Sequence, residues 1–312
     1  MRIVSLLPSA TEICFALGLG SSLVGVTHEC DFPPQAGYKP ILTRSQLDHR
    51  QASPKDIDRH VRAALHQGSS LYALDQALLA RVRPDLILTQ ELCKVCAVAY
   101  PEVMEAARLL PGRPTLVSLE PTTLAAVLRS VMDVGQVTGT RERAAELLRG
   151  LWARLDAVRG VVAGRARPRV VCLEWLDPLM VAGHWVPDQV DWAGGNDVLG
   201  ESGARSRVIE PAELAAAQPE VILSLPCGLR LAEASQQTRA LSSLKGWAKL
   251  PAVKAGRVYA LDGSWYFNRP GPRVVDGVEM LARILQPDAW RGPAPQAFER
   301  VVPGEVGGAA SG

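Results

Sequence analysis

One strand pattern occurs twice in this chain, about half its length apart, and it constrains the fold more than any other feature. Arg2-Ile3-Val4-Ser5-Leu6 corresponds to Arg169-Val170-Val171-Cys172-Leu173, and Arg83-Pro84-Asp85-Leu86-Ile87-Leu88-Thr89 corresponds to Gln218-Pro219-Glu220-Val221-Ile222-Leu223-Ser224. Each short apolar run is typical of a buried strand and is followed by a loop. The repetition predicts two similar α/β lobes, which would bind ligands outside the carboxyl ends of their parallel strands.

Length and composition exclude several classes of protein. A chain of 312 residues is long enough for about two domains, and 47% apolar with 21% charged residues indicates a folded globular protein. The formal net charge is +2, and no Lys/Arg stripe alternates with aromatic residues, so we expect no nucleic-acid partner. No apolar run approaches the ~20 residues that cross a bilayer, so the chain is not expected to be membrane-embedded. Nothing in the sequence requires more than a monomer.

The first residues have the apolar character of a signal peptide, but Pro8 and Glu12 interrupt the apolar run. A strand at Ile3–Leu6 and a helix capped by Ser9, with Glu12 three residues later, fit a folded segment better. We therefore expect an unexported, cytoplasmic chain, or a periplasmic one if the start is misassigned. In the cytoplasm the six cysteines would be reduced. Cys14 and Cys172 fit small core residues.

The order of the patterns predicts the domains. Alternating strand and helix signals over residues 1–138 predict an N-terminal α/β lobe. Residues 140–163 contain no proline and repeat apolar side chains at helical spacing, so residues 139–164 are predicted to form a rigid linking helix that permits only small hinge motion. A second α/β lobe is expected over residues 165–300 and a disordered tail over residues 301–312.

Two loops in the first half carry side chains that bind metals. His28, Glu29 and Cys30 follow one predicted strand, and Gln90, Cys93 and Cys96 follow another. Cys-x-x-Cys with a third thiolate and an imidazole is a donor set that holds zinc or an iron–sulfur cluster. Two other interpretations stay open: polar loop residues that shape a pocket, and a redox dithiol.

The second half concentrates the aromatic residues, which make up only 5% of the chain, on predicted loops. The candidate ligand contacts there are Trp175, His184, Trp185, Trp265, Tyr266, Phe267, Asn268 and Arg269, and Cys227 is a fourth candidate metal thiol. Aromatic faces suit a large, flat, partly apolar ligand, whose polar rim Asn268, Arg269 and Gln90 would orient. The alternative is that these rings cover the lobe cores. The helix opening at Ser9 offers free backbone N–H groups to a phosphate or amide oxygen, unless Ser9 is only a cap.

Several motifs together resemble a known family. These are Arg2 to Glu12 with Gly18-Leu19-Gly20, Leu23-Val24-Gly25-Val26, Arg83-Pro84-Asp85-Leu86-Ile87 and Gly256-Arg257-Val258-Tyr259. They resemble the cobalamin and iron-siderophore substrate-binding proteins of ABC importers, and the cobalamin-binding branch most of all. The resemblance implies a class III periplasmic-binding-protein-like fold, with two Rossmann-like lobes joined by a single long helix. It also implies a ligand held between the lobes and an ABC permease as partner.

The sequence therefore predicts a binding protein for a corrinoid, cobalamin-like ligand in an inter-lobe cleft, linked to ABC-type uptake and without catalysis of its own. His28 is a candidate axial nitrogen for cobalt, because imidazole suits transition metals. The alternative is a cytosolic metalloprotein or enzyme in which Cys30, Cys93, Cys96 and Cys227 hold zinc or an iron–sulfur centre. A third hypothesis is a binder of haem or of an iron chelate.

Overall fold

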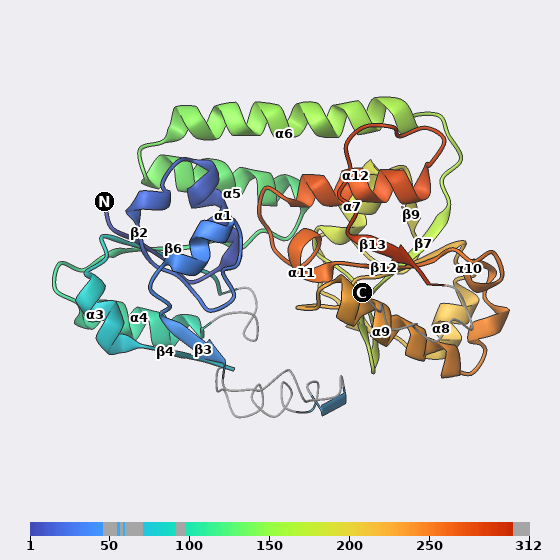
Figure 1. Ribbon diagram of the computed structural model, residues 1–312, viewed down its shortest axis with the longest axis horizontal. Helices are drawn as coiled ribbons and strands as arrows, with labels where there is room; N and C mark the ends of the chain where they lie inside the picture. The colour runs from blue at the N-terminus through green and yellow to red at the C-terminus, as the bar shows by residue number, and fades with distance from the viewer. Residues whose placement is uncertain (46–54, 57–58, 60–70, 92–97, 302–312) are drawn as a thin grey trace, which may run out of the picture. The chain divides into compact units, whose positions relative to one another are not determined.

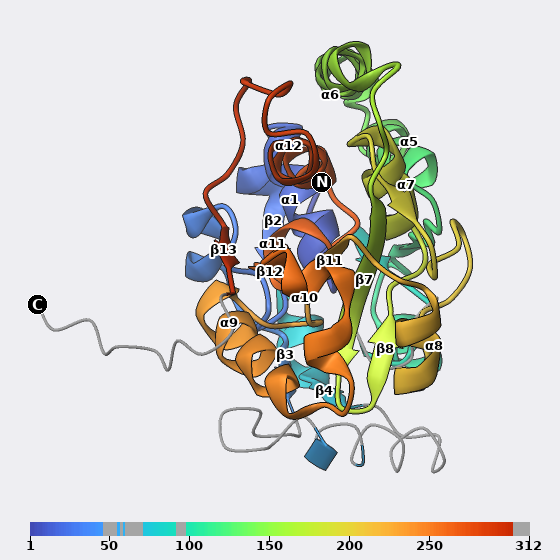
Figure 2. The same cartoon turned by 90° about the vertical axis from the view of Figure 1, so that its right-hand side faces the viewer.

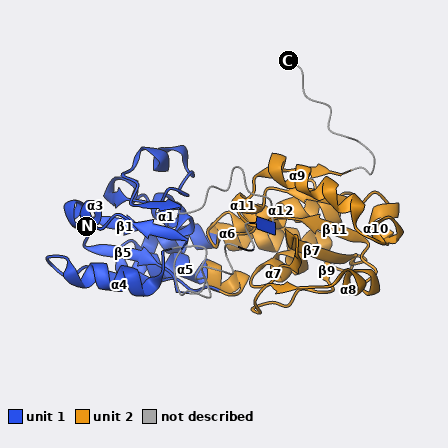
Figure 3. Cartoon of the chain, turned by 90° about the horizontal axis from the view of Figure 1, so that it is seen from below, with its two compact units in different colours: residues 1–121, 128–149 blue, residues 122–127, 150–312 orange. Residues whose placement is uncertain are grey.

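The computed structural model describes residues 1–45, 55–56, 59, 71–91 and 98–301. The chain divides into two compact units (Figure 3): unit 1 comprises residues 1–121 and 128–149, and unit 2 comprises residues 122–127 and 150–312. Two sequence-based expectations, the pair Cys93 and Cys96 and the tail after residue 301, lie outside the described residues. The sequence pattern also predicts a helix over residues 54–66, and most of this segment lies outside them too.

Unit 1 is built on a four-stranded parallel sheet. In spatial order its strands are β2 (Leu23–Gly25), β1 (Ile3–Ser5), β5 (Leu86–Thr89) and β6 (Thr115–Ser118). Strands β1 and β5 are buried along their whole length, as expected for parallel strands that are covered on both faces. A separate antiparallel pair consists of β3 (Thr43–Ser45) and β4 (Tyr72–Leu74).

Helices cover both faces of this sheet (Figure 1). They are α1 (Pro8–Ala16), α3 (Gln76–Val82), α4 (Tyr100–Leu109), α5 (Leu124–Val137) and α6 (Arg141–Val162). Ile3 and Leu86 pack with residues of α1, α5 and α6, whereas Val4 and Ile87 pack with residues of α3 and α4. This alternation follows the two-residue period of a strand. The long helix expected over residues 140–163 is confirmed as α6, and the boundary between the units falls inside it.

Unit 2 contains a larger mixed sheet. Its strands run in the order β10 (Arg207–Val208), β8 (Leu179–Val181), β7 (Arg169–Leu176), β11 (Val221–Ser224), β12 (Val258–Leu261) and β13 (Phe298–Arg300), and β9 (Asn196–Asp197) pairs with β7. The central strands β7, β11 and β12 are parallel, and the outer strands β8, β10 and β13 are antiparallel to their neighbours. Figure 2 shows β8 beside the long strand β7. The helices are α7 (Val186–Trp192), α8 (Pro211–Ala216), α9 (Leu231–Ala240), α10 (Pro251–Lys254), α11 (Gly263–Tyr266) and α12 (Val274–Leu285).

The sequence repeat reappears as a duplicated set of hydrogen bonds. In unit 1 the backbone N–H of Arg2 donates to the Asp85 carboxylate (2.7 Å), and Arg2 Nε donates to the carbonyl oxygen of Val82 at the end of α3 (2.8 Å). In unit 2 the backbone N–H of Arg169 donates to Glu220 (2.8 Å), and Arg169 Nε donates to the C-cap carbonyl oxygen of α8 (3.2 Å). An arginine at the start of a strand therefore hydrogen-bonds to the end of a helix at equivalent places in both units.

The backbone repeats as well. Arg83 and Gln218, which each precede a proline, have φ angles of 42° and 43°. A left-handed residue after a helix is usually glycine, because a Cβ atom is strained there. Two non-glycine residues therefore share an uncommon conformation at equivalent places of the two units.

One expectation about α1 is wrong. The sequence predicts Ser9 as the helix cap, but the helix begins at Pro8, its N-cap is Leu7, and no side chain caps it. Proline fits the first helical position because its fixed φ suits the helix and its missing N–H would have no partner there. Ser9 is consequently inside the first turn, where it is buried.

Candidate ligand-binding site

The first set of candidate residues lies where β2 ends. Beyond this strand Val26 bridges to Ile41, and the Val26 backbone bonds to Pro40 (2.9 Å) and Leu42 (2.8 Å). This extension places Thr43, at the start of β3, next to the loop that follows Thr27. No local sequence signal points to Thr43, because 15 residues separate it from its partner, His28.

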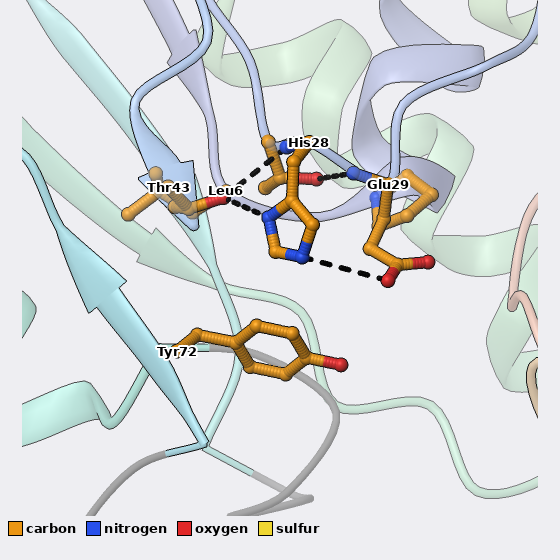
Figure 4. A pocket seen from close by; sticks show the side chains of 7 residues that line it. Leu6, His28, Glu29, Thr43 and Tyr72 are labelled. Carbon is orange, nitrogen blue, oxygen red and sulfur yellow. Dashed lines mark hydrogen bonds and ion pairs between the residues drawn. The ribbon is translucent and has the colours of Figure 1, made fainter. Parts of the chain in front are cut away.

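His28 is held in one orientation by that threonine (Figure 4). Its backbone N–H donates to Thr43 Oγ1 at 3.2 Å, and its ring Nδ1 lies 2.7 Å from the same oxygen. In the tautomer that carries its proton on Nδ1, this nitrogen donates to Thr43 and Nε2 keeps its lone pair. Histidines that bind metals have this arrangement, because the second bond fixes the tautomer and the ring.

A small hollow lies beside the imidazole of His28, whose Nε2 is buried. It is lined by Leu6, Pro8, Thr27, His28, Glu29, Thr43 and Tyr72. His28 Nε2 lies 3.6 Å from Glu29 Oε1, and the rings of His28 and Tyr72 are 5.1 Å apart between centroids. The hollow has a volume of only about 10 Å³, so a large flat ligand would cover it and could not enter it. Tyr72 is a second residue that the sequence analysis missed.

Behind the hollow, Cys30 belongs to a buried polar chain. Its Sγ lies 3.1 Å from Thr11 Oγ1 and 3.2 Å from Thr27 Oγ1, and Thr11 Oγ1 donates to Ser5 Oγ at 2.8 Å. Burial, together with the nearby Cys30, raises the pKa of the Cys14 thiol to about 12. The Cys14 thiol therefore stays protonated at neutral pH, as expected for a core residue.

The zinc or iron–sulfur hypothesis finds no site in the described part of the chain. No group of three or more His, Cys, Asp or Glu side chains there is arranged to hold a metal ion. Cys93 and Cys96 lie outside the described residues, and Cys227 belongs to unit 2, where its backbone N–H donates to the Glu174 carbonyl oxygen (3.0 Å). Gln90, a candidate ligand contact in unit 1, directly follows β5 and is buried.

In unit 2, the loop after β8 packs on the segment after α11. Trp185 Nε1 donates to the carbonyl oxygen of Phe267 at 2.8 Å, and Phe267 is fully buried. His184 has a φ of 51°, and its ring lies 5.7 Å from that of Trp185. Burial lowers the pKa of His184, and the positive charge of the neighbouring Arg205 lowers it further. The imidazole is therefore neutral at physiological pH. Trp185 and Phe267 therefore have core packing, whereas His184 remains half-exposed.

Trp265 is oriented by charged residues that the sequence analysis did not include in the site. Asp262 caps α11 by accepting the Trp265 backbone N–H (2.9 Å) and also accepts from Arg230 Nε (2.5 Å). The guanidinium of Arg230 lies 3.5 Å from the Trp265 ring centroid, and that of Arg273 lies 4.7 Å from it. Tyr266 meets Trp265 edge-on, with 6.3 Å between centroids. Cation–π contacts of this kind hold an indole in place while it stays half-exposed.

The remaining candidates of unit 2 occupy separate environments. Trp175 is half-exposed, and its Nε1 donates to the Asp177 carbonyl oxygen at 3.0 Å. Asn268 is half-exposed as a residue, but its Oδ1 is buried and accepts no hydrogen bond from the described residues. Arg269 is buried. The half-exposed candidates of unit 2, whose side chains can still meet a ligand, are Trp175, His184, Trp265, Tyr266 and Asn268.

Glu174 gives a pH-dependent prediction. Burial raises its pKa, and the hydrogen bond that Ser206 Oγ donates (2.8 Å) only partly offsets this effect. The folded state therefore binds more protons than the unfolded state between the ordinary and the raised pKa. The free energy of unfolding consequently falls as pH rises through that window and then levels off. Asp197, whose pKa burial also raises, adds to this slope.

Glu174→Gln should remove the contribution of this carboxyl, because the amide stays neutral. We expect the variant to be more stable than wild type at neutral pH and to show a flatter dependence on pH. Urea denaturation from about pH 4 to about pH 8 measures this. Glu201→Gln, at an exposed position, is the control that should follow wild type. An unchanged slope in Glu174→Gln would refute the assignment.

Comparison with known proteins gives the family. Residues 3–264 match the model of the family described as "Periplasmic binding protein". The chain belongs to the periplasmic binding protein family. A vitamin B12-binding protein of Vibrio cholerae serotype O1 is 26% identical over 292 residues, which cover 91% of this chain and 89% of that protein. An uncharacterized ABC transporter substrate-binding lipoprotein of Bacillus subtilis, YvrC, is 24% identical over 298 residues, covering 93% and 81%.

Solved structures of periplasmic binding proteins share the fold. The vitamin B12-binding protein BtuF of Vibrio cholerae superposes with a TM-score of 0.67 at 23% identity, covering 91% of this chain and 96% of that one. The haem-binding protein RhuT of Roseiflexus gives 0.68 at 24% identity, covering 91% and 97%. The expected fold class, α/β with Rossmann-like units and one long helix between them, is confirmed. None of the described helices has the length and apolar character of a membrane span.

Proposed function

We propose that this periplasmic binding protein captures a cobalt corrinoid of the cobalamin type and delivers it to an ABC permease. The family and the names of its relatives support this class of function: one binds vitamin B12 and another is an ABC transporter substrate-binding lipoprotein. Such names also support a site of action outside the cytoplasm. The cytoplasmic location expected from the sequence finds no support among them.

The observation that carries the proposal is the geometry of His28. Thr43 holds Nδ1, and the buried Nε2 lies 3.6 Å from Glu29 Oε1, on the side of the ring where Tyr72 also lines the hollow. An imidazole held in this way is a good ligand for a transition metal at the centre of a flat macrocycle. The apolar side chain of Pro8 in the same lining would pack on the corrin face. We therefore assign His28 as the axial ligand of cobalt.

Haem is the second candidate, and one observation favours it. A tyrosine oxygen is the axial ligand of iron in some haem proteins. Tyr72 lies beside His28, and both residues line the hollow. Iron would accept either donor, whereas cobalt in a corrinoid prefers nitrogen. The relative affinities for aquacobalamin and ferric haem distinguish these two ligands.

A spectroscopic titration tests the function. Aquacobalamin should bind with a shift of its visible bands as Nε2 replaces the bound water, whereas cyanocobalamin, whose exchangeable position holds cyanide, should bind without that shift.

Elemental analysis of protein purified anaerobically tests the metalloenzyme alternative, which requires stoichiometric zinc or iron. Failure to bind any corrinoid or haem, in protein with native circular dichroism, would refute the proposal.

Whether residues of unit 2 contact the same ligand stays a prediction of the sequence. Trp265 is its best probe, because its half-exposed ring is held by Arg230 and Arg273. Trp265→Ala should weaken aquacobalamin binding roughly tenfold, since an aromatic contact contributes about 1 kcal/mol beyond its buried area. Trp152→Ala removes an equally large ring from α6 and should leave affinity unchanged. Equal affinities of Trp265→Ala and wild type would remove Trp265 from the site.

A further inference from the structure

A second hollow in unit 1 lies at the edge of the sheet where the strands begin. It is lined by Arg2, Ala80, Arg81 and Arg83 and has a volume of about 620 Å³. Arg2 directly precedes β1, and the other three residues lie at the end of α3 or just after it. The His28 loop follows the opposite, carboxyl end of the strands, so the two hollows occupy different ends of unit 1.

The charged residues that line this hollow are all basic. None of its four lining residues is acidic, and the nearby Asp85 accepts the backbone N–H of Arg2. The side chains of Arg81 and Arg83 are exposed and form no hydrogen bond or ion pair with the described residues. Their guanidinium N–H groups can therefore donate hydrogen bonds to a ligand from outside the chain.

The internal repeat shows that the fold does not need these two arginines. Arg2 corresponds to Arg169, and both make the same bonds to a carboxylate and to a helix end. At the positions of Arg83 and Arg81, however, unit 2 has Gln218, with the same φ angle, and Ala216. A favourable contact of arginine with the carbonyl end of a helix would apply equally in unit 2. The additional positive charge is specific to unit 1.

We propose that this hollow binds a phosphate-bearing anion. Guanidinium groups stay charged at all physiological pH values and donate pairs of parallel hydrogen bonds that match phosphate oxygens. Three of them around one open hollow suit an anion with more than one negative charge. The phosphate comes either from a soluble molecule or from a lipid headgroup.

The second unit supplies the test variant. Arg81→Ala with Arg83→Gln copies the residues that unit 2 tolerates at the same positions, so the double variant should fold normally. Arg141→Gln with Arg149→Gln is the matched control, because it also removes two exposed arginines, here from α6. Pyrophosphate is titrated calorimetrically into each intact protein at low salt. Sedimentation with phosphatidylglycerol vesicles, and with phosphatidylcholine vesicles as reference, is measured in parallel.

Wild type should bind pyrophosphate, with protection from hydrogen exchange at residues 80–86. The test variant should bind at least about tenfold more weakly, since two charge-assisted contacts are lost, while the control stays within about twofold. Binding to phosphatidylglycerol that pyrophosphate displaces would identify a lipid headgroup, and binding to pyrophosphate alone would identify a soluble ligand. Equal losses in both variants, or no binding of either probe by wild type, would overturn the proposal. Aquacobalamin affinity should be the same in all three proteins.

Discussion

Replacing Phe267 by alanine should lower the free energy of unfolding by about 3–5 kcal/mol. The Phe267 ring is completely inaccessible to solvent and is among the largest side chains of the chain that are fully buried. Its loss would leave a cavity, because the surrounding backbone is fixed: the Phe267 carbonyl oxygen accepts from Trp185, and Gly277 packs closely on the ring. Urea denaturation followed by far-UV circular dichroism measures the change.

Phe267→Leu is the matched control for this prediction. Leucine fills much of the cavity, so we expect a loss below about 1.5 kcal/mol. Measuring both stability and aquacobalamin affinity also decides whether Phe267 is a core residue or, as the sequence predicts, a ligand contact. Normal stability of Phe267→Ala with a selective loss of aquacobalamin affinity would show that this ring is a ligand contact and not a core residue.

His28→Ala should weaken the binding of aquacobalamin roughly 100-fold, equivalent to about 2.8 kcal/mol, and should abolish the visible shift. The reason is the loss of the nitrogen that we assign to cobalt. Cyanocobalamin affinity should change much less, because its cyanide occupies the coordination position. Titrations of both ligands into the variant and wild type provide this comparison directly.

The threonine beside His28 allows a sharper version of this test. Thr43→Val keeps the shape of the side chain but removes the hydroxyl that lies 2.7 Å from Nδ1, and we expect about a tenfold loss of aquacobalamin affinity. Thr43→Ser keeps the hydroxyl and should bind like wild type. Equal affinities of the valine and serine variants would mean that Thr43 does not orient the imidazole.

Much of the fold could be predicted because its signals are local. The apolar runs at Ile3 and Leu86 became adjacent parallel strands, and their repeats at Val170 and Val221 did the same in unit 2. The pattern over residues 140–163 became α6 almost to the residue. In these segments the periodicity of the side chains and the burial of both faces favour the same structure.

The site was predicted less completely because its contacts are not local. Thr43 and Tyr72 reach His28 through the antiparallel pairing of β3 and β4, which no local pattern indicates. In unit 2 the aromatic run was expected on a loop, whereas Trp265 and Tyr266 belong to the short helix α11. The turn of α11, however, leaves Trp265 half-exposed and buries Phe267. Which of several consecutive aromatic residues faces solvent depends on this short helix and its Asp262 cap.

Coordination of the metal of a corrinoid by His28 can be detected by electron paramagnetic resonance of the bound ligand. Cob(II)inamide, which lacks the nucleotide base and hence an axial nitrogen of its own, is bound to protein labelled with ¹⁵N-histidine. We predict that each cobalt hyperfine line splits into a doublet from one ¹⁵N nucleus, and that His28→Ala, labelled in the same way, shows no such splitting. Bound cob(II)inamide without nitrogen splitting in wild type, or with the same doublet in His28→Ala, would contradict the account.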